Sequence, residues 1–597
     1  MTGSRSVRQY KNRIRRVAMS NNQVSKVEQG AEKFFFRASS ESFSKVPGAP
    51  IAYWTTDPFR ATYNSSELLG SAVRICAGLQ TGDNNRFLRF WHETALEKQN
   101  LANGSRDSGK WFPYNKGGEL RKWYGNRDYV VNWESEGKEI YEFRPRSVLR
   151  NPDFYFLEGI TWSDITTRSF AARYTPSGCL FDVKGSSAFP SADKLGLVLA
   201  LMNSCLTNKY MHVLNPTVTF QVGDISRIPL RYVASVDGKV KKLIEFAKND
   251  WDSYETSWDF TSLPLLHHDH RQPTLKASYQ SLRTHWLEMT LEMKSLEEEN
   301  NRIFIDAYGL HDELDEKVDI SEITLTCNPH YRYGGDKSVE ELEAQLLADT
   351  MRELVSYGVG CMFGRYSLDK PGLILANQGE TLMDYLAKVP QPSFPAEDDT
   401  VIPLLDGDWF PDDITLRFRQ FLRVAFGDVS YEDNLAFIEQ ALNVKGKRNY
   451  SLRDYFLGEF YADHVKRYKK RPIYWLFSSP KGTFSALVYL HRYRPDTVSV
   501  VLNYLRDFRK KLTSRLDYLQ QVAISTSVSQ SEKTKANKEA EIIKKQLIEL
   551  DDYERDTLYP LATEQVELYL DDGVKFNYLK LGAALKKIVG LDAKAED

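Results

Sequence analysis

Two glycine-punctuated stretches, GLQTGDNNRFLRFWHE at residues 78–93 and GKWFPYNKGGELRKWYGN at residues 109–126, set the character of the N-terminal part of the sequence. From Arg106 to Arg127 there are six basic residues against two acids, interleaved with five aromatic residues. Basic side chains bind phosphates and aromatic rings stack on sugars or bases, so the mixture suits a nucleic-acid surface. It equally suits a small sheet with its aromatics packed inside and its charges solvated. Composition alone leaves both interpretations open.

Outward from these stretches, the pattern predicts an α+β protein. From Phe43 to about Leu230, short runs rich in β-branched and aromatic residues alternate with Gly, Pro and Asn turns, which indicates a mostly β domain. Residues 194–214 have helical apolar spacing and predict one helix inside it. After Pro229, long helices are predicted at 274–308 and 339–366, and two charged helices at 492–519 and 533–559 should pair as a hairpin.

The length of 597 residues exceeds what one hydrophobic core supports, so we expect a multidomain chain. The predicted order is a basic leader (1–42), the mostly β domain (43–235), a helical spacer (236–310), a helical or mixed domain (311–388), a linker or surface loop (389–413), and a C-terminal domain that is first mixed and then a helical hairpin (414–597).

Charge and cysteine content narrow the function classes. Lys plus Arg number 79 against 81 Asp plus Glu, a net charge of -2, so any nucleic-acid site must be local. Five cysteines without CxxC spacing indicate neither a zinc module nor a disulfide framework and favour a reducing, cytoplasmic setting. No apolar run is long enough for a spanning helix, so no membrane contact is expected.

A cofactor loop would need glycines between a strand and a helix. The glycines at 117–118 lie in a polar loop and those at 358–360 lie inside a helical pattern, so neither predicts a cofactor site or a Rossmann-like domain.

Two further motifs have bland interpretations that we favour. Asn328-Pro329-His330-Tyr331 resembles the Asn-Pro-Pro-aromatic turn with which amino-methyltransferases grip a flipped base, but His330 replaces the second proline, which favours a structural turn. The run His267-His268-Asp269-His270 contains suitable metal ligands, but it has no partner cluster at known spacing, so incidental surface histidines are favoured and no metal is predicted.

Taken in order, several blocks resemble the C-terminal half of the PglX family, the adenine-specific DNA methyltransferases of BREX phage-defence systems. They are TGDNNRF (81–87), KWFPYNKGGELRKWYGN (110–126), SFAARYTPSGCLFDVKGSSAFP (169–190), LNPTVTFQVGDISRIP (214–229), LEEENNRIFIDAYGL (296–310), CMFGRYSLDKPGL (361–373) and YWLFSSPKGTFSALVYLHRYRPDT (474–497).

This resemblance implies a target-recognition domain followed by spacer and C-terminal domains of an enzyme that transfers methyl from S-adenosylmethionine to adenine N6. The family's catalytic domain is expected upstream of Phe34. Residues 1–33 are too few to form it, because a Rossmann-like domain needs more than about 100 residues. The leader would therefore be the remnant of a link to that domain. We therefore expect no cofactor or catalytic residue in this chain, with S-adenosylmethionine required only by the complete enzyme.

The expected DNA contacts are cations for phosphates, asparagines for base edges, and Trp123 and Tyr124 for packing on sugars or bases. The predicted set is Asn84, Asn85, Arg86, Arg89, Lys110, Asn115, Lys116, Arg121, Lys122, Trp123, Tyr124, Arg127, Arg168, Arg173 and Lys184.

Three functions follow as hypotheses. The leading one is a DNA target-recognition subunit that directs a catalytic domain supplied elsewhere, with double-stranded DNA and a separate methyltransferase chain as partners. The second is a methyltransferase in its own right. The third is a scaffold without DNA affinity that docks other BREX proteins or phage inhibitors through the paired C-terminal helices.

Overall fold

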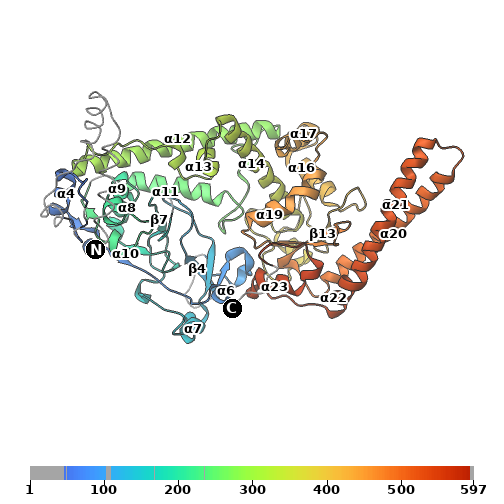
Figure 1. The fold of residues 1–597 in the computed structure, drawn as a ribbon, viewed down its shortest axis with the longest axis horizontal. Coiled ribbons are helices and arrows are strands. Elements are labelled where there is room, and N and C mark those ends of the chain that lie inside the picture. The colour runs from blue at the N-terminus through green and yellow to red at the C-terminus, as the bar shows by residue number, and fades with distance from the viewer. Residues whose placement is uncertain are drawn as a thin grey trace, which may run out of the picture.

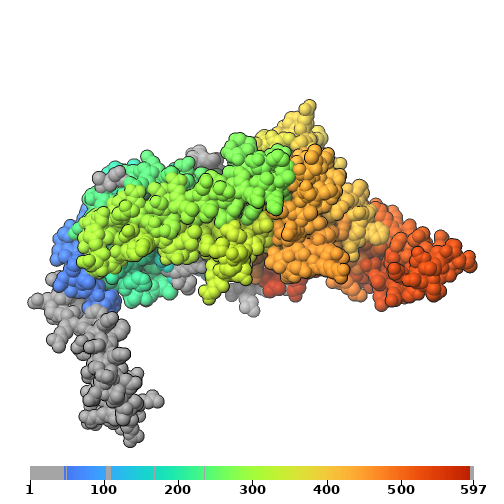
Figure 2. Space-filling model, turned by 90° about the horizontal axis from the view of Figure 1, so that it is seen from above, coloured from blue at the N-terminus to red at the C-terminus, as the bar shows by residue number. Residues whose placement is uncertain are grey.

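The computed structural model describes residues 46–48, 50, 52–101, 109–166, 169–233 and 236–591. Within this part, small sheets are surrounded by helices, so the expectation of an α+β protein is confirmed. The molecule is elongated (Figures 1 and 2). In Figure 1 the long helix α12 runs along the upper edge, and a helical hairpin projects from the right-hand end. The leader (1–42), Arg106 and Arg168 lie outside the described residues.

Two four-stranded sheets form the N-terminal region. The first has the order β2 (Arg74–Cys76), β9 (Ser187–Phe189), β6 (Gly159–Trp162), β7 (Ala172–Thr175), and all its pairs are antiparallel. The second has the order β3 (Leu88–Phe90), β5 (Tyr129–Asn132), β4 (Trp111–Asn115), β8 (Leu180–Phe181), with β4 and β8 parallel. All five residues of β4 are buried, so the aromatic residues of this strand pack inside the sheet domain. The short pair β1 (Glu67–Leu68) and β10 (Pro229–Leu230) joins the two ends of the region.

The helix predicted at 194–214 is two helices, α8 (Ala192–Met202) and α9 (Cys205–Leu214). Asn203 lies at the break, and its amide donates to the carbonyl of Ala172 at 3.0 Å and accepts from its N–H at 2.9 Å. Asn203 therefore satisfies the backbone of β7 at the point where the helix is interrupted.

The long helices agree with the sequence prediction. Helix α12 (Leu275–Tyr308) begins after the N-cap Thr274 and ends at Gly309, which has φ 68°. Helix α14 (Val339–Met362) begins in a capping box at Ser338 and ends slightly before the predicted boundary. Helix α11 (Asp237–Asp252) connects the sheets to α12.

The C-terminal part of the chain contains a three-stranded antiparallel sheet with the order β11 (Val401–Pro403), β13 (Ser485–Tyr489), β12 (Tyr474–Ser478). Strand β11 lies within the segment predicted as a linker or loop (389–413), and Val401 and Ile402 are fully buried in the core. This segment is therefore partly a structural strand. The helices near this sheet are α16 (Ile414–Phe426), α17 (Tyr431–Leu442) and α19 (Tyr461–Arg467) (Figure 1).

The predicted hairpin is confirmed as α20 (Thr497–Ile524) and α21 (Gln530–Tyr553). Ion pairs cross between the two helices, with Arg515 Nε 2.8 Å from Glu539 Oε1 and Arg509 Nη2 2.7 Å from Asp551 Oδ1. The shorter helices are α4 (Asp57–Asn64), α5 (Leu69–Ala72), α6 (Asn84–Phe87), α7 (Glu134–Glu142), α10 (Val222–Ile225), α13 (Pro329–Tyr333), α15 (Leu382–Lys388), α18 (Leu452–Tyr455), α22 (Tyr559–Glu564) and α23 (Val574–Lys580). Among the helices of the described residues, none combines the length and apolar character needed to cross a bilayer.

Three histidines of the interior, His92, His464 and His491, are almost completely buried. Burial, followed by the positive charge of Arg365, lowers the pKa of His491 to about 3. Burial also lowers the pKa values of His92 and His464 well below the usual range. The folded protein therefore holds these rings neutral under mildly acidic conditions.

We predict that the contribution of these three histidines to stability is full above about pH 6.5 and falls as the pH decreases below it, because the unfolded chain binds protons that the buried rings exclude. Each such histidine adds up to about 1.4 kcal/mol per pH unit to this slope. Thermal unfolding from about pH 8 to about pH 5 measures it. His491→Gln should flatten the slope, whereas a change at the exposed His311 should not. Equal slopes for wild type and His491→Gln would contradict the prediction.

Candidate nucleic-acid interface

The predicted basic segment at 121–127 is held against α12 by a buried carboxylate. Glu297 accepts from Lys122 Nζ at 2.6 Å and from Trp123 Nε1 at 2.7 Å. Lys122 and Glu297 are 6% and 3% exposed, and Trp123 is fully buried. A buried charge is destabilising unless it is paired and hydrogen-bonded, and here each group satisfies the other. These contacts join the sheet region to the long helix.

A second buried acid, Asp250 of α11, holds Arg121. Arg121 Nη1 lies 3.1 Å from Asp250 Oδ2, and the same carboxylate accepts from the N–H groups of Thr326 and Cys327 at 2.7 and 2.9 Å. The Arg121 guanidinium also lies over the ring of Trp251 at 5.0 Å. Arg121 is thus a structural link between the loop after β4, α11 and the segment before α13.

The neighbouring predicted residues are also interior. Arg127 lies over the ring of Trp258 at 4.8 Å, and Asn115 donates to Thr175 Oγ1 at 3.2 Å. Burial, and then the charge of Arg121, lower the pKa of Arg173 to about 10. Seven of the predicted residues are at most 7% exposed and present almost no surface to a duplex in this conformation: Asn115, Arg121, Lys122, Trp123, Tyr124, Arg127 and Arg173. The packed-sheet interpretation fits the two aromatic residues but not the four cations, which are buried rather than solvated.

A second group of predicted residues lines a cavity of about 570 Å³ where β3 and the adjoining α6 face α23. Asn84 and Asn85 of α6 contribute to its wall, together with Arg89 and Lys116. Arg471 and Lys575, which the sequence analysis did not select, complete its basic side. The other lining residues are Leu88, Phe90, Glu93, Tyr129, Asp572, Gly573, Phe576 and Leu579. Cations, aromatic rings and amides therefore converge in one place.

One wall of this cavity is fixed by acids. Asp571 accepts from Trp111 Nε1 at 2.9 Å and from Lys110 Nζ at 3.3 Å, and its carbonyl accepts from Arg89 Nε at 3.0 Å. Glu93 accepts from the N–H of Val574 at 2.9 Å, and burial raises the pKa of its carboxyl. Lys110 and Arg89 therefore help to hold the C-terminal segment on the second sheet.

The other predicted cations that the structure describes, Arg86 and Lys184, are more exposed, and each pairs with one acid. Arg86 Nη2 lies 3.4 Å from Glu139 Oε2, and Lys184 Nζ lies 3.0 Å from Asp164 Oδ2. Half or more of the surface of each of these two basic side chains is exposed. The exposed pair of Arg86 with Glu139 contributes little to stability, so Arg86 can exchange its acid for a phosphate at small cost, whereas Lys184 is paired with the buried Asp164.

Four exposed arginines that were not predicted lie on β2 and in the segment that follows α7. We call Arg74, Arg144, Arg146 and Arg150 the arginine surface. Among the described residues, no carboxylate oxygen lies within 4.0 Å of a guanidinium nitrogen of these four arginines. Arg146 and Arg86 both lie over the ring of Phe143, at 5.8 and 5.2 Å. The sequence could have predicted a basic surface at residues 144–150, because this segment contains three arginines and no acid.

Backbone pairing places this surface next to the TGDNNRF block. Gln80 and Val148 exchange two hydrogen bonds, at 2.9 and 2.8 Å, and Arg74 Nη2 donates to Asn151 Oδ1 at 3.0 Å. Helices α6 and α7 lie on the side of the molecule opposite α12 (Figure 1). Helix α7 carries four glutamates, so the phosphate-binding potential rests with the arginines that flank it rather than with the helix.

The Asn328–Tyr331 motif is a structural turn, as predicted. Asn328 is 1% exposed; its amide donates to the carbonyls of Ile320 and Ile323 at 2.8 and 2.9 Å and accepts from the N–H of His330 at 3.2 Å. The amide is thus committed to capping α13.

The glycines at 358 and 360 lie within α14 and allow close packing. A Cβ at Gly358 would lie 2.8 Å from the Phe418 ring, and one at Gly360 would lie 2.5 Å from the Tyr366 ring. Gly117 and Gly118 lie in the loop after β4, which does not lead directly into a helix. Neither pair of glycines forms a strand–turn–helix phosphate loop.

Comparison with known proteins found no matching family model. The chain is 36% identical over 577 residues to the adenine-specific methyltransferase BrxX of Escherichia coli O9:H4 (strain HS), which covers 94% of this chain and 47% of that protein. It is also 36% identical over 580 residues to the adenine-specific methyltransferase PglX of Lacticaseibacillus casei (strain Zhang), with 94% and 46% covered. The chain therefore spans about half the length of the curated relatives it matches.

The buried contact at Glu297 yields a stability prediction. Glu297→Ala should lower the free energy of unfolding by about 3 to 5 kcal/mol, because Lys122 would remain charged, buried and unpaired. Glu299→Ala, on the same helix but 42% exposed at its side chain, should change it by less than about 0.5 kcal/mol. Thermal unfolding of both variants measures the difference. Equal melting temperatures for the two variants would show that the contact is dispensable.

Proposed function

Since this chain is a PglX-like protein, we propose that it is the DNA target-recognition part of an adenine-specific DNA methyltransferase of a BREX phage-defence system. The observation that carries the proposal is the 36% identity to BrxX across 94% of the chain. Its substrate would be double-stranded DNA. Its functional partner would be a catalytic methyltransferase domain, in the same or a separate chain.

Two features of the structure support DNA contact outside the buried segment. The arginine surface offers four exposed arginines, and guanidinium is well suited to phosphate oxygens. The adjoining cavity adds Lys116, Arg471 and Lys575, with the amides of Asn84 and Asn85 at its edge. We assign phosphate contact to the arginines and base-edge contact to the two asparagines.

S-adenosylmethionine binding is proposed outside the described residues, because neither glycine pair has the strand–turn–helix context of a cofactor loop. Of the two glycine pairs, one is packed inside α14 and the other lies in a loop after a strand without a following helix. The Asn328 amide, which a methyltransferase would need for the target base, caps α13. Cofactor binding is therefore proposed for the complete enzyme only.

A scaffold function is the second candidate, and one observation favours it. The projecting hairpin exposes Tyr518, Ile524, Ile542 and Ile548, each with more than half of its surface accessible. Exposed apolar side chains on a projecting element are suited to a protein partner, such as another BREX component or a phage inhibitor.

The DNA-binding proposal predicts salt-dependent affinity that the arginine surface controls. Fluorescence anisotropy of labelled duplex DNA, at several salt concentrations, should give a steep decrease of log K with log salt. The variant Arg144→Ala/Arg146→Ala/Arg150→Ala should reduce that slope by about 0.9 for each phosphate contact removed, up to about 2.7.

A control variant with the same charge change is Lys535→Ala/Lys538→Ala/Lys545→Ala on α21, where all three lysines are exposed. It should leave the slope unchanged. Equal losses in both triple variants would indicate a general charge effect, and absence of duplex binding by the folded chain at low salt would favour the scaffold function.

A further inference from the structure

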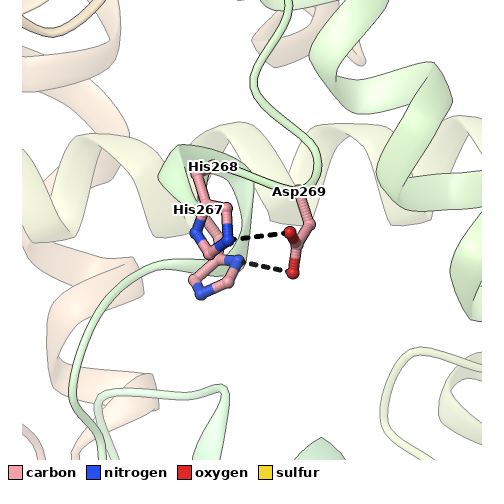
Figure 3. Close-up of side chains that lie close together, drawn as sticks. All are labelled: His267, His268 and Asp269. Atoms are coloured by element: carbon pink, nitrogen blue, oxygen red, sulfur yellow. Dashed lines mark ion pairs between the residues drawn. The ribbon is translucent and has the colours of Figure 1, made fainter.

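The histidine run at 267–270 forms a converging donor cluster on the loop before α12. His267 Nδ1 lies 3.2 Å from Asp269 Oδ2, and His268 Nε2 lies 2.9 Å from Asp269 Oδ1. Figure 3 shows both rings and the carboxylate pointing toward one another from this loop. All three candidate ligand atoms lie within 4.8 Å of one another, and the three residues are exposed to solvent.

The backbone holds this arrangement from both sides. The 3₁₀ turn Pro264–Leu266 ends at His267, whose carbonyl accepts from the N–H groups of His270 and Arg271 at 3.0 and 2.9 Å. Leu265, just before the run, is 1% exposed and anchors the turn in the core. After the run, Gln272 N donates to Ser278 Oγ of α12 at 2.8 Å. The backbone of the run is therefore already ordered before an ion binds.

We propose that His267, His268 and Asp269 form a surface site for a divalent transition cation of the zinc type. Two imidazole nitrogens and one carboxylate oxygen are a ligand set that Zn²⁺ accepts, with water in the fourth position, whereas Mg²⁺ and Ca²⁺ prefer oxygen ligands. Zn²⁺ sits about 2.0 to 2.2 Å from such ligands, so a tetrahedral site needs ligand spacings of about 3.3 to 3.6 Å. The two N···O distances, 3.2 and 2.9 Å, run to different oxygens of Asp269, and the three candidate ligand atoms lie within 4.8 Å of one another, so binding requires side-chain rotation to bring them into this range.

Further histidines surround the cluster. The ring of His270 lies 6.5 Å from that of His267 and 5.0 Å from that of His285, which belongs to α12.

The test is zinc binding by the purified chain without a polyhistidine tag, measured by calorimetry and by competition with a chromogenic chelator. We expect one Zn²⁺ per chain, with micromolar affinity that excess Mg²⁺ does not reduce. His267→Gln/His268→Gln should weaken binding by at least about tenfold. Absence of zinc binding by the wild-type chain in this range would overturn the proposal.

Two controls separate this site from other donors. His311→Gln removes a different exposed histidine that lies 3.5 Å from an acid, Asp306, and should leave zinc affinity unchanged. Cys205→Ser removes the partly accessible cysteine and should also have no effect. Wild-type affinity in the His267→Gln/His268→Gln variant would assign the ion elsewhere. DNA affinity should not change in that variant, so the metal site and the DNA-binding proposal fail independently.

Discussion

The carboxylate of Glu297 is the contact on which the arrangement of the sheet region and α12 depends. A lysine and an indole N–H share its two oxygens in an environment from which water is almost completely excluded. Asp250 of α11 forms a similar buried ion pair with Arg121. Because a buried ion that loses its partner is costly, these two acids fix the position of residues 121–123 relative to α11 and α12.

This constraint divides the basic residues of the N-terminal region into two populations. Those at 121–127 are interior and connect secondary-structure elements, whereas those at 74, 86 and 144–150 face solvent around α6. The proposed DNA contact therefore rests on the exposed population, while the interior population holds the elements together. The cavity lined by Asn84 and Lys116 lies at the border of this surface and is closed by the C-terminal segment around Asp571.

Local signals in the sequence were sufficient for much of the fold. The N-cap Thr274 and the left-handed Gly309 delimit α12, and charge pairs such as Arg515 with Glu539 accompany the C-terminal hairpin. The structural turn at Asn328 also followed from His330 in place of proline. The burial of Lys122 and Arg121 could not be foreseen, because their acids are 175 and 129 positions away in the chain. Sequence composition does not reveal which charged residue meets a distant partner. Conversely, the arginines at 144–150 were readable, but they lack the aromatic interleaving that directed attention to 109–126.

Hydrogen–deuterium exchange of the chain with and without duplex DNA tests the division between the buried joint and the exposed surface most directly. The backbone around Lys122 and Trp123 should exchange slowly in both states, while residues 81–87 and 144–150 should gain protection when DNA is added. Protection gained at 121–127, with no change at 144–150, would contradict the account.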